Sequence, residues 1–147
     1  MFYMVMHFLE MKNFWDCRNE DFGMILGSRF KGKIAVGAMP PLHRYFGTPF
    51  LTFMTNILFG THISDSQSGM RMFKREALEK INLESTGMEF ATELTTKISK
   101  NKMKIIEIPI NLYKDGRVNG KPHLKPWRDG FRHLFFMLKI KFLYHPN

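Results

Sequence analysis

The most constraining feature of the sequence is a change in the spacing of its apolar residues. Three of them first recur at steps of four, which places them on one face of a helix: Phe90, Leu94 and Ile98. Over residues 105–112 apolar residues instead alternate with other residues, the period of a half-buried strand, and Pro109 favours an edge position. A helix followed closely by such a strand predicts an α/β fold.

The remaining patterns extend this alternation of helical and extended segments. In chain order they predict a helix over 1–17, a short buried strand over 22–26, a packed helix over 49–60, an extended segment over 70–73, a short helix over 75–81 and a helix over 88–100. Pro49 suits the first turn of its helix and Gly60 suits its end. The order predicts a mixed sheet with flanking helices.

Composition limits the class of protein and the kind of partner. With 147 residues and 44% hydrophobic content, the chain is one domain or part of one and can build a core. The formal net charge of +9 indicates an anionic partner, which can be a nucleic acid, a membrane surface or a phosphorylated substrate. The single Cys17 excludes an intramolecular disulfide and is interpreted as structural. No apolar run reaches the roughly 20 residues of a bilayer-spanning helix.

Residues 127–147 differ in character from residues 1–126 and form a separate amphipathic segment. Their apolar stripe consists of Phe131, Leu134, Phe135, Leu138 and Phe142. Basic residues accompany it: Arg128, Arg132, Lys139 and Lys141. Such a helix can lie in a membrane interface, attracted to anionic lipid heads. The alternative is a helix packed on its own domain, which is favoured when the segment is considered by itself, and the composition alone does not decide between the two.

Several short motifs occur in an order that resembles one enzyme family. They are Arg29, the segment 43–48, the segment 65–71, the segment 87–93, the segment 107–110 and the segment 115–117. Over about residues 21–143 the chain resembles family 2 glycosyltransferases, in the branch of dolichyl-phosphate mannose or glucose synthases. Each motif alone is weak, but the ordered set is specific. The resemblance implies the C-terminal part of a nucleotide-sugar transferase fold for residues 1–126, and an interfacial helix after it.

The resemblance also implies a reaction and a binding site. A hexose passes from a nucleotide sugar to a polyprenyl phosphate at the cytoplasmic face of a membrane, with inversion at the anomeric carbon. The residues that match the acceptor-phosphate site are Arg29, Arg44, Thr48 and Arg117. A guanidinium can grip phosphate oxygens through parallel hydrogen bonds, which suits this task. The alternative is that these arginines are ordinary solvated charges, or that Arg44 lies over an apolar helix.

Four further residues match the catalytic floor of the family: Asp65, Arg71, Glu89 and Glu93. Asp65 can hold sugar hydroxyls or help to position the nucleophile, and one of the two glutamates can share this work. Each also has an ordinary structural interpretation. Asp65 can begin a turn, Arg71 can pair with a nearby carboxylate, and one glutamate can be a solvated helix residue.

The chain departs from the family pattern in two places. Family enzymes begin with a nucleotide-binding half that ends in an Asp-x-Asp pair, whose carboxylates hold Mg²⁺ or Mn²⁺ against the donor diphosphate. We expect these ligands to be absent from this chain, so that it has no metal site and binds a nucleotide sugar only when the missing half is supplied. Lys121, Pro122 and His123 stand where related synthases often have Ser-Lys.

Two other classes of function stay open at this stage. One is a noncatalytic module that binds lipid phosphate or a membrane surface through the same arginines and the terminal helix. The other is nucleic-acid binding, which ranks last because the basic residues are dispersed and no recognised motif for it occurs. We therefore expect no nucleic-acid partner.

Overall fold

A computed structural model describes residues 8–85, 89–114 and 126–144 of the chain. In chain order, the elements are α1 (Phe8–Asp16), the 3₁₀ helix η1 (Cys17–Asn19), β1 (Met24–Ser28), the π-helix η2 (His43–Gly47), α2 (Thr48–Phe59), β2 (Arg71–Phe73), α3 (Arg75–Glu79), α4 (Phe90–Lys100), β3 (Ile105–Pro109) and α5 (Pro126–Leu143). The predicted α/β class and the predicted order of elements are confirmed. The first seven residues of the predicted N-terminal helix lie outside the described part.

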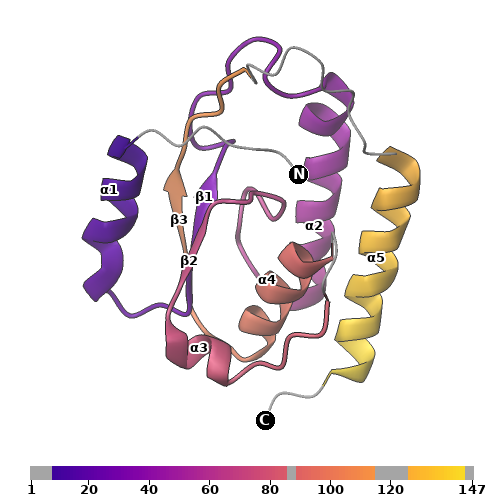
Figure 1. Ribbon diagram of the computed structural model, residues 1–147. Helices are drawn as coiled ribbons and strands as arrows, with labels where there is room; N and C mark the ends of the chain where they lie inside the picture. The colour runs from indigo at the N-terminus through magenta and orange to yellow at the C-terminus, as the bar shows by residue number, and fades with distance from the viewer. Residues whose placement is uncertain (1–7, 86–88, 115–125, 145–147) are drawn as a thin grey trace.

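The three strands form one mixed sheet in the order β2-β1-β3. β1 pairs antiparallel with β2 and parallel with β3, so that Leu26 lies between Arg71 and Glu107. Among the described residues β3 is an edge strand, as Pro109 predicts. In Figure 1, α1 covers one side of the sheet, α4 and α2 lie on the other side, and α5 lies outside α2.

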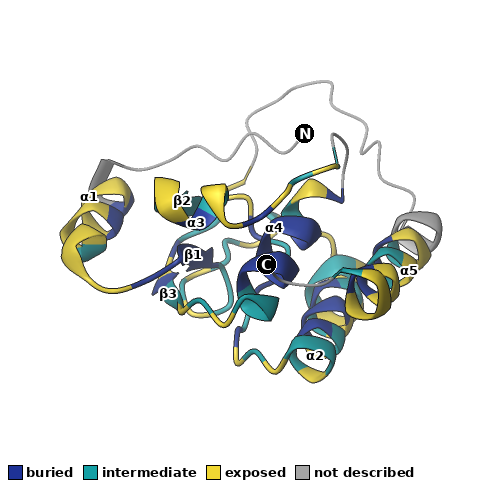
Figure 2. Ribbon diagram, turned by 90° about the horizontal axis from the view of Figure 1, so that it is seen from below, coloured by how far each residue is buried: buried dark blue, intermediate teal, exposed yellow. Residues whose placement is uncertain are grey.

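Side chains of β1 alternate between two apolar clusters, one on each face of the sheet. On the side of α1, the cluster consists of Phe14, Phe22, Ile25, Met70, Ile108 and Ile110. On the side of α4, it consists of Met24, Leu26, Ile63, Ile81, Leu94 and Ile98. This alternation is what the pleat of a strand buried on both faces requires. Figure 2 shows β1 buried between the two layers.

The chain between β1 and α2 passes very close to the residues after β3. A Cβ atom at Gly32 would lie 1.9 Å from the carbonyl oxygen of Ile110, so that only glycine fits there. Backbone hydrogen bonds continue this contact, from Ala35 N–H to the carbonyl of Leu112 and from Leu112 N–H to the carbonyl of Lys33. The contact fixes the path of the loop that carries Arg29 and Lys31.

α2 begins and ends within one residue of the predicted bounds, but it does not have the predicted packing. Pro49 lies in its first turn, and Gly60 ends it in the left-handed conformation. The apolar side chains of Phe50, Phe53 and Ile57 are exposed, so the prediction of a packed helix is wrong for this face. The reason is that the buried face of α2 is rich in threonine, and the threonine hydroxyls bond to the loop after the helix and to α5.

The helix over 88–100 also needs a correction. α4 begins at Phe90, and Leu94 and Ile98 are fully buried against β1 as predicted. Phe90 is 41% exposed, because only the later turns of α4 lie over the sheet. The apolar face predicted from steps of four is therefore shorter than the sequence indicates.

α5 packs on α2 and α4 through its buried side chains Met137, Ile140 and His133. Lys100 of α4 caps the C-terminal end of α5, because the Lys100 ammonium donates hydrogen bonds to the carbonyls of Ile140 (3.0 Å) and Lys141 (2.8 Å). Much of the predicted apolar stripe faces away from these contacts and is exposed: Phe131, Phe135, Leu138 and Phe142. Within the described segments, none of the helices has the length and apolar character needed to cross a bilayer.

Candidate functional site

A buried ion pair lies at the carboxyl end of β1. The Nε and Nη2 atoms of Arg29 donate to the two carboxylate oxygens of Asp65 at 2.6 and 2.7 Å, and the backbone N–H of Arg29 donates to the same carboxylate at 3.1 Å. The side chain of Asp65 is 0% exposed and that of Arg29 is 16% exposed. A bidentate, desolvated pair of this kind fixes both side chains in one geometry.

Residues 64–68, which include Asp65, form a loop that is called the acidic loop below. Hydrogen bonds from its backbone N–H groups to Glu107 hold it in position. Glu107 of β3 accepts hydrogen bonds from the backbone N–H of Ser64 at 2.7 Å and of Asp65 at 3.2 Å, and from the Ser64 hydroxyl. Its carboxylate also accepts from the Lys31 ammonium at 2.7 Å. The Ser64 hydroxyl lies 2.6 Å from that of Ser28, which connects the loop to β1. Glu107 therefore sets the backbone position of Asp65.

The same loop is held through its carbonyl groups by Arg71 of β2. Its guanidinium donates to the carbonyls of Ser66 and Ser68, both at 2.8 Å, and to the carbonyl of Ala91 and the hydroxyl of Thr95 on α4. Burial lowers the pKa of Arg71 to about 10, the charge of Asp65 opposes this shift, and that of Arg29 adds to it. Arg71 therefore stays charged at neutral pH and connects the acidic loop to α4.

The two glutamates predicted from the resemblance lie on or just before α4, and each has its own partner. Glu89 precedes α4, is buried, and forms an ion pair with Arg132 of α5. Glu93 pairs with Lys97 at 2.6 Å and accepts from the backbone N–H groups of Glu84 and Ser85. Burial raises the pKa of Glu93, but the hydrogen bonds from Lys97 and the two N–H groups outweigh it and hold the pKa below its ordinary value. Within the described residues, neither glutamate forms a hydrogen bond or an ion pair with Asp65.

The structure places the remaining predicted residues less tightly. Thr48 is buried at the start of α2, one turn before Thr52, whose hydroxyl bonds with the hydroxyl and backbone N–H of Ser66 in the acidic loop. The guanidinium of Arg44 lies 5.6 Å from the ring centroid of Tyr45. Arg117, like Lys121 and His123, lies outside the described residues.

The site as described is suited to orienting anions rather than to proton transfer. Both oxygens of Asp65 are engaged by Arg29, and both oxygens of Glu107 are engaged by the loop and Lys31. Within the described residues, no group of three His, Cys, Asp or Glu side chains is placed to hold a metal ion. The sequence assigned Arg29 to the acceptor-phosphate site and Asp65 and Arg71 to the catalytic floor, whereas the structure brings all three into one cluster; no role was predicted for Glu107 or Lys31. The signal for Glu107 was a carboxylate in the middle of an isoleucine-rich strand.

Comparison with known proteins identifies enzymes whose sequences are similar to this chain. The chain is 42% identical over 121 residues to the low-salt glycan biosynthesis hexosyltransferase Agl6 of Haloferax volcanii, a match that covers 82% of this chain and 29% of that protein. It is 35% identical over 94 residues to the UDP-N-acetylglucosamine–dolichyl-phosphate N-acetylglucosaminyltransferase of Methanococcus voltae, which covers 63% of this chain and 37% of that protein.

A third relative comes from a bacterium. The chain is 37% identical over 59 residues to the polyprenol monophosphomannose synthase of Mycolicibacterium smegmatis, which covers 38% of this chain and 22% of that protein. No protein-family model matches the chain. The chain thus spans well under half the length of each of these relatives. Over the residues that it shares with them, these relatives support the resemblance of the chain to the family 2 glycosyltransferases, in the branch of the dolichyl-phosphate sugar transferases.

Proposed function

We propose that this chain forms the acceptor-binding part of a glycosyltransferase that moves a hexose from a nucleotide sugar to a polyprenyl phosphate. The observation that carries the proposal is the buried Arg29–Asp65 pair at the carboxyl end of β1, in a chain whose relatives include a dolichyl-phosphate transferase. In open α/β sheets, ligands bind outside the carboxyl ends of the strands. The pair lies at the place where a substrate is expected.

The acceptor phosphate is expected to bind between the end of β1 and the start of α2. An acceptor phosphate oxygen is already anionic at neutral pH, so its attack on the sugar needs orientation and charge compensation more than a strong base. Arg29, Arg44 and the hydroxyl of Thr48 supply these groups in our proposal, together with Arg117. Asp65 holds Arg29 in place and orients the reacting groups.

The donor side of the reaction is assigned by resemblance. In a complete family enzyme, an Asp-x-Asp pair holds Mg²⁺ or Mn²⁺ against the donor diphosphate, and the ion compensates the charge of the leaving group. We propose that this chain meets a nucleotide sugar only together with a segment that supplies such a pair. The choice of sugar and nucleotide then belongs to that segment.

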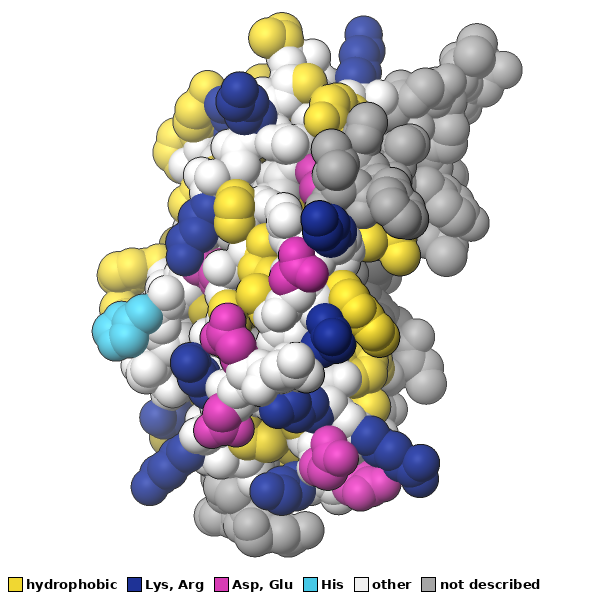
Figure 3. Space-filling view, turned by 90° about the vertical axis from the view of Figure 1, so that its left-hand side faces the viewer, with side chains coloured by type: hydrophobic (Ala, Val, Ile, Leu, Met, Phe, Trp, Pro, Cys, Tyr) yellow, Lys and Arg dark blue, Asp and Glu magenta, His cyan; other side chains and the backbone are white. Residues whose placement is uncertain are grey.

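We further propose that the protein lies peripherally on the cytoplasmic face of a membrane. The exposed apolar side chains of α2 and α5 support this, because the two helices pack side by side and both present aromatic residues outward, as Figure 2 shows by the exposed residues along their outer sides. Lys139 and Lys141 of α5 are exposed near them and can bind anionic lipid heads. On the side that includes α1, basic and acidic side chains are instead interspersed (Figure 3).

The experiment that tests the transferase proposal is a sugar-transfer assay. Membranes that express this chain, alone or with any segment encoded upstream, receive radiolabelled nucleotide sugars and polyprenyl phosphate. We expect labelled lipid only when the upstream segment is present. Transfer by the chain alone would contradict the assignment of the donor site to another segment, and absence of transfer in every membrane that contains the folded chain would contradict the proposed activity.

The noncatalytic alternative, a module that only binds lipid phosphate, has no support from these relatives, since two are named as transferases and one as a synthase. The same assay distinguishes it. A module of that kind would retain lipid-phosphate binding in membranes where every combination of segments fails to transfer sugar.

A further inference from the structure

The cluster around the acidic loop carries one positive charge in excess. Three cations, Arg29, Lys31 and Arg71, lie together with two carboxylates, Asp65 and Glu107. The five groups are coupled: Arg29 pairs with Asp65, Lys31 pairs with Glu107, and the charges of Arg29 and Asp65 both act on Arg71. A partly buried cluster with an uncompensated positive charge attracts an anion.

Among the cations of this cluster, Lys31 is the most exposed to a ligand. Arg71 uses its guanidinium on four protein oxygens, and Arg29 is bound bidentately by Asp65. The side chain of Lys31 is 48% exposed, whereas that of Glu107 is 4% exposed. An ammonium has three N–H donors, and Glu107 accepts from one of them at 2.7 Å. Glu107 thus holds the ammonium in place and leaves its other donors available.

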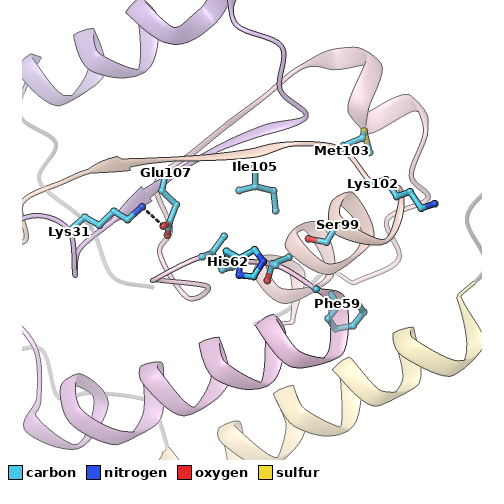
Figure 4. A pocket seen from close by; sticks show the side chains of 11 residues that line it. Lys31, Phe59, His62, Ser99, Lys102, Met103, Ile105 and Glu107 are labelled. Atoms are coloured by element: carbon cyan, nitrogen blue, oxygen red, sulfur yellow. Dashed lines mark ion pairs between the residues drawn. The ribbon is translucent and has the colours of Figure 1, made fainter.

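A cavity of about 450 Å³ begins at this ammonium. Lys31 and Glu107 lie at one end of the cavity, and Ser99 and Lys102 lie at the other end, where α4 ends, as Figure 4 shows. The walls between them include four apolar side chains: Phe59, Ile63, Met103 and Ile105. The volume lies in the usual range of small-molecule sites, and these four side chains offer an apolar surface to a ligand.

We propose that Lys31 is a phosphate-binding residue, and that the cavity beside it takes a phosphate ester, with the ammonium on the phosphate and the apolar walls along an attached alkyl chain. The inference rests on the proposed function for the presence of phosphate-bearing substrates. It adds a contact to the arginine site and assigns Glu107 the task of positioning the Lys31 ammonium. The phosphate can come from a polyprenyl phosphate or from the donor diphosphate, and both share this chemistry.

The test measures binding by the purified chain and needs no sugar transfer. Farnesyl phosphate in detergent represents the lipid acceptor, uridine diphosphate represents the donor, and farnesol lacks the phosphate; calorimetric titration gives each Kd. Lys31→Gln removes the cation. Lys33→Gln is the matched control, because Lys33 is an exposed lysine two residues further along the same loop.

We expect Lys31→Gln to weaken farnesyl phosphate binding about tenfold, the loss of one charge-assisted contact, while Lys33→Gln stays within about twofold. Lys31→Arg keeps the charge and should restore binding, which separates a lost contact from a disturbed loop. A loss confined to uridine diphosphate would support Lys31 as a phosphate ligand and identify the donor as the source. Equal Kd values for Lys31→Gln and the unaltered chain with both phosphates would overturn the proposal, and failure of the transfer assay would not affect it.

Discussion

At the scale of single residues, the acidic loop is held by two side chains of opposite charge. The carboxylate of Glu107 accepts hydrogen bonds from the N–H groups of the loop, and the guanidinium of Arg71 donates to its carbonyls. Each kind of backbone group therefore meets a charge opposite to its own partial charge. Buried backbone groups without such partners are costly. The geometry of the Arg29–Asp65 pair therefore depends on residues that do not touch a substrate.

Replacing Arg71 tests this dependence. Arg71→Met leaves the carbonyls of Ser66, Ser68 and Ala91 without their donor, and we expect the free energy of unfolding to fall by about 3–5 kcal/mol. Denaturant titration measures it. Arg75→Met is the control, because the Arg75 side chain is exposed and pairs with exposed Glu79, and the change should stay within about 0.5 kcal/mol. Equal losses for the two variants would contradict the account.

Glu93 gives a prediction about pH. Its pKa in the folded chain lies below the ordinary value of 4.5, so its ionised form stabilises the fold. This contribution is fully present above pH 4.5 and is lost as the pH falls through the lower, folded pKa. We expect Glu93→Gln to show a shallower loss of stability below pH 4.5 than the unaltered chain, measured by thermal melts. An unchanged slope in Glu93→Gln, matching that of the exposed control Glu79→Gln, would show that Glu93 is not the group responsible.

At the scale of elements, the order of helices and strands could be predicted from the sequence, but their bounds and exposure could not. The predicted strand 22–26 lies two residues later, over Met24–Ser28, because its pairing with β3 is set by a partner more than 75 residues away. Phe50, Phe53 and Ile57 form an apolar face that periodicity assigns to a core, yet they are exposed, since hydrophobicity gives no information about which face finds a neighbour.

The exposed faces of α2 and α5 carry the membrane proposal, and vesicle binding tests it. We expect Phe53→Ser on α2 and Phe135→Ser on α5 each to reduce partitioning onto vesicles with anionic lipid by about tenfold, because each removes a large apolar side chain from the surface. Co-sedimentation measures the bound fraction. The control is Met11→Ser, also exposed but on α1, across the sheet. Membrane docking through α2 and α5 would be excluded if all three variants bound as well as the unaltered chain.

At the scale of the whole molecule, part of the site could be predicted because family motifs mark it. Motifs selected Arg29 for the acceptor-phosphate site and Asp65 for the catalytic floor, but no motif predicted that the two side chains form an ion pair. Glu107 and Lys31 were not assigned, because their role depends on the parallel pairing of β1 with β3, which brings residues 31, 64 and 107 together. Motifs identify single residues, whereas the pairing of the strands determines which of these residues lie in contact.

The most direct test of the central claim is a chimaera of Agl6. The 121 aligned residues of that hexosyltransferase are replaced by those of this chain, and transfer of radiolabelled hexose to polyprenyl phosphate is measured in membranes. Our account predicts labelled lipid from the chimaera, and loss of at least about tenfold on Arg29→Gln, which removes the guanidinium beside Asp65. A chimaera that melts cooperatively and still transfers no sugar, or one whose activity is unaffected by Arg29→Gln, would contradict the claim that this chain forms the acceptor site.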